Sequence, residues 1–288
     1  MTTMEEIRDY WNISPPMKSD YEKGTLEWSR DITKHRWSVV PYIHKFLDAD
    51  KYIGKNILDL GCGSGSDILE FAKAGAIIHG IDVTDKAVKI TRSRLLAEDY
   101  NIFVQNIRTY NGKHIPYNNE SFDMVYSGGV LHHTPYMDDL LAEIHRVLKP
   151  GGTFKAMVYH KDSLLYFYSI LLRRFREGLD ISRDAALSRW SEFREGCPYT
   201  RAFTRSEMKY KLHYFKDVQT WVTYCVYDEP TNRKLPGARL FDVEKTGVAD
   251  IDFFFEQYND DFNRQVKAKQ GENYLEQYGW HLLIEAEK

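Results

Sequence analysis

Residues 56–82, which read NILDLGCGSGSDILEFAKAGAIIHGID, restrict the possible folds of this 288-residue chain more than any other segment. An apolar run typical of a buried parallel strand comes first, and a helical pattern and a second apolar run follow it. Between the first run and the helix, Gly61, Gly63 and Gly65 allow a tight turn and the close approach of a ligand to the backbone. Asp82 closes the second run, where a carboxylate can accept hydrogen bonds from both hydroxyls of a ribose. The segment therefore predicts an α/β fold that binds an adenosine-containing cofactor.

The spacing of the glycines helps to choose between two cofactors. A dinucleotide-binding turn needs Gly-x-Gly-x-x-Gly, whereas this chain has Ser66 and the pattern Gly-x-Gly-x-Gly. Further segments follow the glycine turn in the order and at the spacing of one family: 116–123, 129–135 and 148–152. Together they resemble the class I S-adenosylmethionine-dependent methyltransferases of the small-molecule type (methyltransferase type 11/25-like). The resemblance covers roughly residues 50–160 and includes a last strand at 279–288.

The resemblance implies a doubly wound, seven-stranded, mostly parallel sheet whose last strand is antiparallel. The alternation of strand and helix patterns also indicates a parallel sheet with helices on both faces. We expect strands near 56–60, 77–81, 102–105, 123–127, 153–159, 218–227 and 280–286. We expect helices near 66–74, 85–98 and 135–148 and around 253–266.

The chain divides into four predicted regions. These are an N-terminal helical lid (1–50), an adenosylmethionine-binding Rossmann-like core (51–160), a helical substrate cap inserted before the sixth strand (161–214), and C-terminal strands that complete the sheet (215–288). Two alternatives stay open. The first region could be a collar packed on the sheet edge, and the arginine-rich cap could be a solvated helical surface rather than a site for an anionic acceptor.

The resemblance implies S-adenosylmethionine as the cofactor and S-adenosylhomocysteine as the product. It places the glycine turn near the methionine moiety, Val83 against the adenine, and Ser127 beside the methionine tail. Asn106 and Ile107 are expected to follow the third strand and to read the adenine edge. The full predicted cofactor set is Asp59, Gly61, Cys62, Gly63, Gly65, Asp82, Val83, Asn106, Ile107 and Ser127.

His132 and His133 are the candidate acid/base residues, because histidine titrates near neutrality and both follow the fourth strand. His132, nearer to the strand end, is the preferred one. The alternative is that one histidine caps local backbone and neither transfers a proton. The predicted contacts of a small, anionic or aromatic acceptor are Tyr10, Trp11, Tyr21, His133, Tyr159, Tyr199 and Arg201. No required metal is expected, since this loop has a glycine and the two histidines where some related quinone O-methyltransferases have acidic ligands.

The composition narrows the possible partners. A net charge of −3, from 39 basic and 42 acidic residues, gives no basic footprint for nucleic acid. The odd set Cys62, Cys197 and Cys225 argues against a disulfide framework and favours a reduced cytoplasm. The N-terminus lacks the pattern of a secretory signal, and the longest apolar run, 164–172, is too short to span a bilayer. We expect a cytoplasmic monomer or homodimer that does not bind membranes.

Other functions remain as alternatives at this point. They are an NAD-dependent oxidoreductase, a catalytically silent adenosylmethionine-binding protein, and an aminopropyl transferase that uses the decarboxylated cofactor. Ser66 and the Leu-Lys-Pro-Gly-Gly turn at 148–152 count against the first. The acceptor and its target atom (oxygen, nitrogen or carbon) are not determined by the fold.

Overall fold

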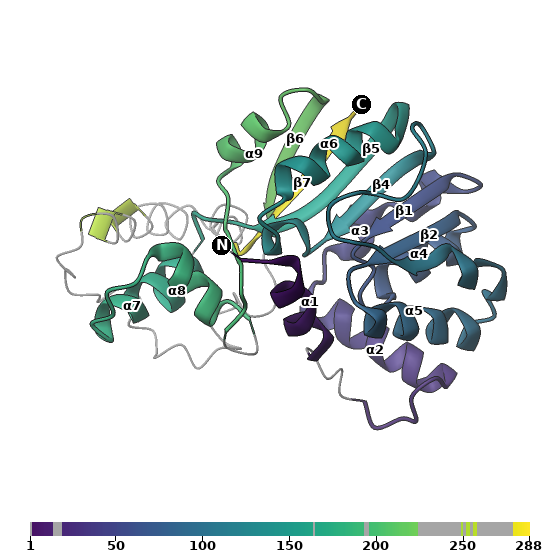
Figure 1. Cartoon of the computed structure of the whole chain (residues 1–288), viewed down its shortest axis with the longest axis horizontal. Helices are drawn as coiled ribbons and strands as arrows, with labels where there is room; N and C mark the ends of the chain where they lie inside the picture. The colour runs from purple at the N-terminus through teal and green to yellow at the C-terminus, as the bar shows by residue number, and fades with distance from the viewer. Residues whose placement is uncertain are drawn as a thin grey trace, which may run out of the picture.

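A seven-stranded sheet organises the chain in the order β3-β2-β1-β4-β5-β7-β6 (Figure 1). The computed structural model describes residues 2–13, 19–163, 165–192, 196–223, 249, 252–253, 256–257 and 279–288. The strands are β1 (Asn56–Leu60), β2 (Ile77–Asp82), β3 (Ile107–Thr109), β4 (Phe122–Gly128), β5 (Leu148–Tyr159), β6 (Lys216–Thr223) and β7 (His281–Glu287). The strands from β3 to β5 pair in parallel, and β7 pairs antiparallel with both β5 and β6. This confirms the expected mostly parallel sheet with an antiparallel last strand.

Helices cover the sheet and extend to one side of it. They are α1 (Met4–Ile13), α2 (Leu26–Val39), α3 (Ile43–Leu47), α4 (Ser66–Ala74), α5 (Asp85–Ala97), α6 (Met137–Val147), a π-helix (Leu165–Leu172), α7 (Arg173–Arg176), α8 (Arg183–Trp190) and α9 (Arg205–Lys211). Figure 1 shows α7 and α8 to one side of the sheet, with α1 between α8 and α2 in that view. The π-helix, α7, α8 and α9 all lie in the region predicted to be a cap.

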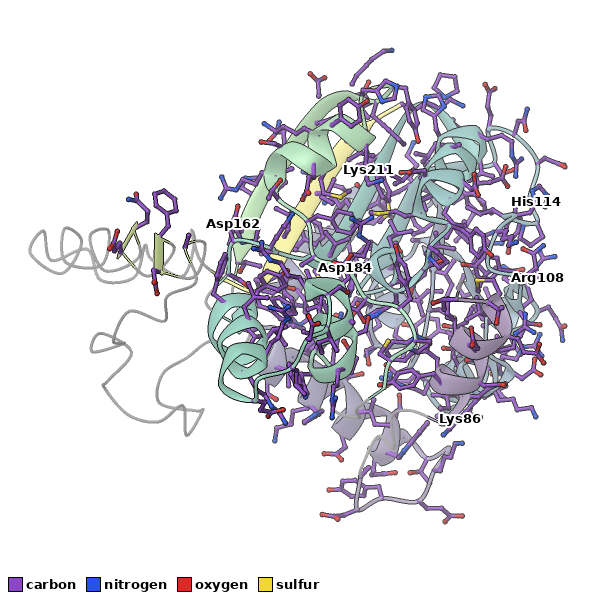
Figure 2. The ribbon with its side chains drawn as sticks, turned by 60° about the vertical axis from the view of Figure 1, so that its left-hand side comes forward. Lys86, Arg108, His114, Asp162, Asp184 and Lys211 are labelled. Carbon is purple, nitrogen blue, oxygen red and sulfur yellow. The ribbon has the colours of Figure 1, made fainter. Side chains whose placement is uncertain are left out.

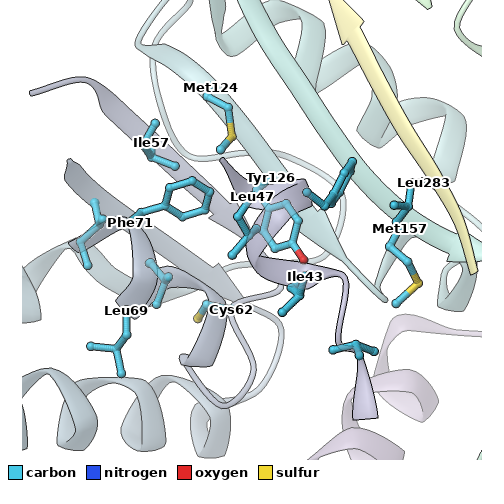
Figure 3. Packing of buried hydrophobic residues seen from close by; sticks show 14 of the residues in the cluster. Ile43, Leu47, Ile57, Cys62, Leu69, Phe71, Met124, Tyr126, Met157 and Leu283 are labelled. Carbon is cyan, nitrogen blue, oxygen red and sulfur yellow. The ribbon is translucent and has the colours of Figure 1, made fainter. Parts of the chain in front are cut away.

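Successive residues of the central strands face opposite sides of the sheet, so two apolar layers form. Ile57 of β1 and Met124 of β4 pack with Phe71 of α4 in the layer that Figure 3 shows. Their neighbours Leu58 and Val125 pack in the other layer, against the apolar faces of α6 and α9. The double layer holds the carboxyl ends of β1, β2 and β4 at one edge, where ligands of such sheets bind.

The prediction of the third strand near 102–105 is wrong. Residues 101–106 form a short 3-10 helix, and β3 begins only at Ile107. The sequence Asn-Ile-Phe-Val has the apolar content of a strand, but Ile102 is exposed. The segment forms a helical turn that leads into β3, which pairs with β2. Ile107 pairs with Gly80 at the start of β3, so neither it nor Asn106 follows the strand.

Some expectations fall partly outside the described residues. The sixth strand is described to Thr223, whereas residues 224–227 of the expected strand are not described. The helix expected around 253–266 lies almost entirely outside them as well. Within the described part of the chain, no helix combines the length and the apolarity needed to cross a membrane.

Candidate functional site

The glycine turn joins β1 to α4 in the conformation that its sequence requires. Gly61, Gly63 and Gly65 have φ angles of 85°, 51° and 76°, in the left-handed region that glycine adopts without a side-chain clash. The Gly61 and Cys62 amides donate to the Ile81 carbonyl at 2.7 and 3.1 Å, which fastens the turn to the end of β2. The turn therefore lies at the carboxyl edge of two neighbouring parallel strands.

The first two glycines meet different surroundings. A Cβ atom at Gly61 would overlap the side chain of Val130, which lies in the loop after β4. At Gly63 the nearest atom to such a Cβ would be the Gly61 carbonyl oxygen, 3.7 Å away. Gly61 is thus needed for packing within the protein, whereas no side chain of the described residues beyond the chain neighbours of Gly63 lies within 4 Å of that Cβ position, which leaves room for a ligand.

Asp82 faces the turn from the end of β2. One carboxylate oxygen, Oδ1, accepts from the Thr84 amide and hydroxyl, both at 2.9 Å. The other, Oδ2, accepts from the Gly63 amide at 3.1 Å. Burial raises the pKa of Asp82, although these hydrogen bonds oppose the rise. A carboxylate has about four acceptor positions, so Asp82 keeps acceptor capacity for a ligand hydroxyl next to Gly63.

Two further acids, Asp59 and Asp67, are buried near this turn. Asp67 of α4 forms a two-bond ion pair with Arg36 of α2, at 3.2 and 2.8 Å. Asp59 of β1 is 3% exposed, and no hydrogen bond reaches its carboxylate from the described residues. Burial raises the pKa of Asp59 well above its usual value, and the charges of Asp67 and Asp82 raise it further, against the effect of Arg36. A cationic ligand at this edge would relieve that repulsion.

Helix α1 lies across the carboxyl edge of the sheet. Arg8 Nε donates to the Val83 carbonyl at 3.1 Å, and Thr2 Oγ1 donates to the Pro198 carbonyl at 3.1 Å. Trp11 meets the ring of His133 edge-on, with the ring centroids 4.9 Å apart. The helix therefore joins the β2 end, the loop after β4 and the cap.

His132 is buried in a cluster of aromatic rings. Its ring lies 3.9 Å from the ring of Tyr159 and 4.1 Å from that of His133, centroid to centroid. Neither ring nitrogen has a hydrogen-bond partner among the described residues. Burial lowers the pKa of His132 well below its ordinary value, and His133 and His281 add to this effect, so the ring is neutral.

His133 is held on both of its nitrogens. Nδ1 lies 3.3 Å from the Tyr199 carbonyl oxygen and 3.2 Å from Thr200 Oγ1. Nε2 lies 3.5 Å from Oε1 of Glu192, which also accepts from the Tyr159 hydroxyl at 2.6 Å. Burial lowers the pKa of His133, and the negative charge of Glu192 and the Tyr199 carbonyl oppose the decrease. Glu192 was missed from the sequence, because nothing distinguishes it from the other charged residues of the cap.

The remaining predicted residues are placed in several ways. The Ser127 hydroxyl donates to the Leu60 carbonyl at 3.0 Å, so its hydrogen is used in a contact between β4 and β1. The expectation that Asn106 and Ile107 follow the third strand is wrong, because Asn106 precedes β3 and Ile107 begins it. The Asn106 side chain donates to the Ile78 carbonyl, and Ile107 is fully buried. Tyr10 is buried against Trp11, whereas Tyr21 is 52% exposed. Cys62 is buried beside Thr91. The Arg201 amide donates to the His132 carbonyl, and the Arg201 guanidinium lies 3.8 Å from the Asp184 carboxylate.

A hollow of about 370 Å³ lies in the cap, between α8 and the loop at 196–200. Asp184 and Arg189 line it on the helix side, and Tyr199 and Thr200 line it on the loop side. Figure 2 marks Asp184 on this part of the surface. The same two loop residues also contact His133 Nδ1, through the Tyr199 carbonyl and the Thr200 hydroxyl. No group of three or more side chains able to hold a metal occurs in the described ranges.

Residues 58–156, which contain the turn, Asp82 and both histidines, match the family model described as a methyltransferase domain. This segment is a class I methyltransferase domain. The ubiquinone biosynthesis O-methyltransferase of Coxiella burnetii is 25% identical to the chain over 197 residues, which cover 62% of the chain and 83% of the relative. The demethylmenaquinone methyltransferase of Symbiobacterium thermophilum is 32% identical over 105 residues, which cover 35% of the chain and 41% of the relative.

Solved structures agree on the fold. The crystal structure of the geranyl diphosphate C-methyltransferase of Streptomyces coelicolor matches with a TM-score of 0.56 and 14% identity, over 99% of this chain and 97% of that chain. The match extends well beyond the methyltransferase domain. The N-terminal helices and the C-terminal strands therefore belong to an arrangement that another protein of this fold also has.

The methyltransferase domain allows a matched test of its first two glycines. Gly61→Ala should lower the free energy of unfolding by about 1–3 kcal/mol, because the new methyl group overlaps Val130. Gly63→Ala should cost less, about 1 kcal/mol, because only its positive φ opposes the side chain. Chemical denaturation of the two variants measures the difference. Equal losses would show that the two glycines do not differ in packing.

Proposed function

We propose that this chain transfers a methyl group from S-adenosylmethionine to a small-molecule acceptor. Asp82 carries the proposal, because it presents a buried carboxylate with spare acceptor capacity next to the open side of Gly63. That is the arrangement that a ribose needs at the carboxyl end of the second strand. The cofactor of this domain is S-adenosylmethionine, and the product formed from it is S-adenosylhomocysteine.

The residues at this edge fit that cofactor in charge as well as in shape. Adenosylmethionine carries a sulfonium and an ammonium, and it supplies an already activated methyl group when bound. Asp59 would take the side of the ammonium, because a bound cation would oppose the effect of burial and keep this carboxyl ionised. Val83 and the backbone of the glycine turn complete the cofactor set that we propose, without Asn106 and Ile107.

We place the acceptor on the other side of the edge, at the two histidines. His133 and Tyr159 offer polar atoms there, and Trp11 offers an aromatic wall. The relatives named above act, by their names, in ubiquinone biosynthesis, on demethylmenaquinone and on geranyl diphosphate. They favour a small acceptor that is flat or anionic, and the O- and C-methyltransferases among them leave the target atom open.

The flanking regions would close the site. We propose that residues 1–50 act as a lid, because α1 contacts Val83 and His133, and Thr2, which precedes α1, contacts Pro198. Residues 161–214 would act as a cap that contributes Tyr199 and Glu192 to the acceptor side. Exclusion of water strengthens the electrostatic interactions at the transferred methyl group. A cytoplasmic location and a monomeric or homodimeric state remain predictions from the sequence.

The ribose assignment can be tested by replacing Asp82. Asp82→Ala removes the carboxylate that would accept from a ribose hydroxyl, and one such charge-assisted hydrogen bond is worth about 1.5–3 kcal/mol. The affinity for S-adenosylhomocysteine in calorimetry should therefore fall by about 10–10²-fold. Asp123→Ala is a suitable control, because this acid pairs with Lys149 at the opposite end of the sheet and should leave the affinity unchanged. Full affinity in Asp82→Ala would show that the ribose binds elsewhere.

The acid/base role can be tested by replacing each histidine. The sequence favours His132, but the contacts favour His133, whose Nε2 faces a carboxylate. For a hydroxyl or acidic carbon acceptor, His133→Asn should lower turnover by about 10²–10⁴-fold and spare the affinity for S-adenosylhomocysteine. Burial lowers the pKa of His133, so its neutral, basic form is present at neutral pH, and turnover should fall as the pH drops through that pKa.

The loss in His133→Asn should shrink at high pH, where the acceptor ionises unaided. His132→Phe, which preserves the aromatic stack, should have the smaller effect. Transfer of a labelled methyl group from adenosylmethionine measures both variants. If both keep nearly normal rates at neutral pH, alignment alone drives transfer and the acceptor is a neutral amine or ionises by itself.

A further inference from the structure

Glu192 reaches the methyltransferase domain from outside it. The residue lies in the cap, beyond the matched segment 58–156, and follows α8 directly. Its Oε1 atom is 3.5 Å from His133 Nε2, 2.6 Å from the Tyr159 hydroxyl and 3.2 Å from the Ser191 hydroxyl. The side chains of His133 and Glu192 are only 5% and 12% exposed, so water screens their interaction weakly.

The contacts of His133 suit its protonated ring. The Tyr199 carbonyl beside Nδ1 and the Glu192 carboxylate beside Nε2 are both acceptors, at 3.3 and 3.5 Å. A neutral imidazole has a single N–H and can donate to only one of them. The imidazolium donates to both, and its hydrogen bond to Oε1 is then charge-assisted. The arrangement therefore favours proton uptake by the His133 ring.

Other groups around His133 do not replace this carboxylate. Trp11 of α1 and Tyr159 of β5 contribute aromatic rings, and His132 packs against the ring of His133. Cys197 places its sulfur 3.7 Å from Nδ1, and burial raises the pKa of this thiol to about 11, so it is uncharged. Among the described residues, Glu192 is the acid that pairs with His133.

We infer that Glu192 is a positioning residue of the cap that raises the proton affinity of His133, so that this enzyme methylates an acceptor that must lose a proton, a hydroxyl or an acidic carbon. The inference rests on the proposed methyl transfer and narrows it. A neutral amine attacks the methyl group without a base, so its methylation would not need a buried imidazole–carboxylate pair. Through Glu192, the cap would be part of the reaction centre as well as a cover over it.

The reaction balances with these groups alone. The acceptor O–H or C–H bond breaks and its proton moves to the His133 ring, and Glu192 stabilises the imidazolium that forms. The acceptor's electron pair forms a bond to the methyl carbon as the carbon–sulfur bond breaks. The electrons of that bond remain on sulfur, which yields neutral S-adenosylhomocysteine. The proton then leaves His133 for solvent, so one proton is released for each methyl group transferred.

Nuclear magnetic resonance titration of the full chain tests the pair without an acceptor. The ring signals of His133, assigned by their loss in His133→Asn, are followed with pH in the wild type and in Glu192→Gln. We expect the midpoint for His133 to move to lower pH by roughly one unit or more in the variant. Glu177→Gln removes an exposed acid of the same cap that pairs with Arg173, and it should leave the midpoint unchanged.

Two outcomes would overturn the inference. One is an equal midpoint for His133 in the wild type and Glu192→Gln, and the other is a ring that stays neutral to the acid limit of folding in both. If Glu192→Gln does not fold, the midpoint of His133 is compared between the wild type and Glu192→Asp. A smaller shift to lower pH is then expected, because the shorter side chain holds the charge further from the ring. Titration of the wild type with S-adenosylhomocysteine is a separate readout, since failure to bind would refute the proposed methyl transfer and leave the midpoint result standing.

Discussion

The burial of Arg94 is the interaction on which the ligand-binding edge depends. Its guanidinium is fully buried, and its donors reach Ser29, Thr33, Ser64 and Ser66. Burial lowers the pKa of Arg94 to about 10, and a buried cation is tolerated only when its hydrogen bonds are satisfied. Ser29 and Thr33 belong to α2, and Ser64 belongs to the glycine turn. The hydrogen bonds of Arg94 therefore fix the position of α2 relative to the turn. The Arg36–Asp67 pair joins α2 to α4 in the same way.

The two sides of the site have different physical characters. On the cofactor side, the backbone of the glycine turn and buried acids such as Asp59 and Asp82 make an edge suited to a cation with a ribose. On the other side, rings stack around two histidines, and Glu192 introduces a negative charge there. Helix α1 contacts both sides through Arg8 and Trp11. Under the proposed function, the core would bind the donor, whereas acceptor binding would also need the lid and the cap.

The sequence predicts the parts of the site that depend on neighbouring residues. The glycine turn, Asp82 and the strands on either side could be placed because their pattern is local. The third strand could not, because the apolar residues of 101–106 fit a strand as well as the 3-10 helix that they form. Contacts between distant residues, such as Glu192 with His133 and Arg94 with Ser29, left no pattern in the chain. Tyr21, one of the predicted acceptor contacts, is 52% exposed, and nothing in the sequence indicated that exposure.

The choice of cofactor is the central claim, and calorimetric titration of the intact chain tests it most directly. S-adenosylhomocysteine and NAD both contain the adenosine that Asp82 can hold, but only the first carries the ammonium that suits Asp59. We predict saturable binding of S-adenosylhomocysteine at one site per chain and no measurable binding of NAD at the same concentrations. Binding of NAD without binding of S-adenosylhomocysteine would contradict the account and favour an oxidoreductase.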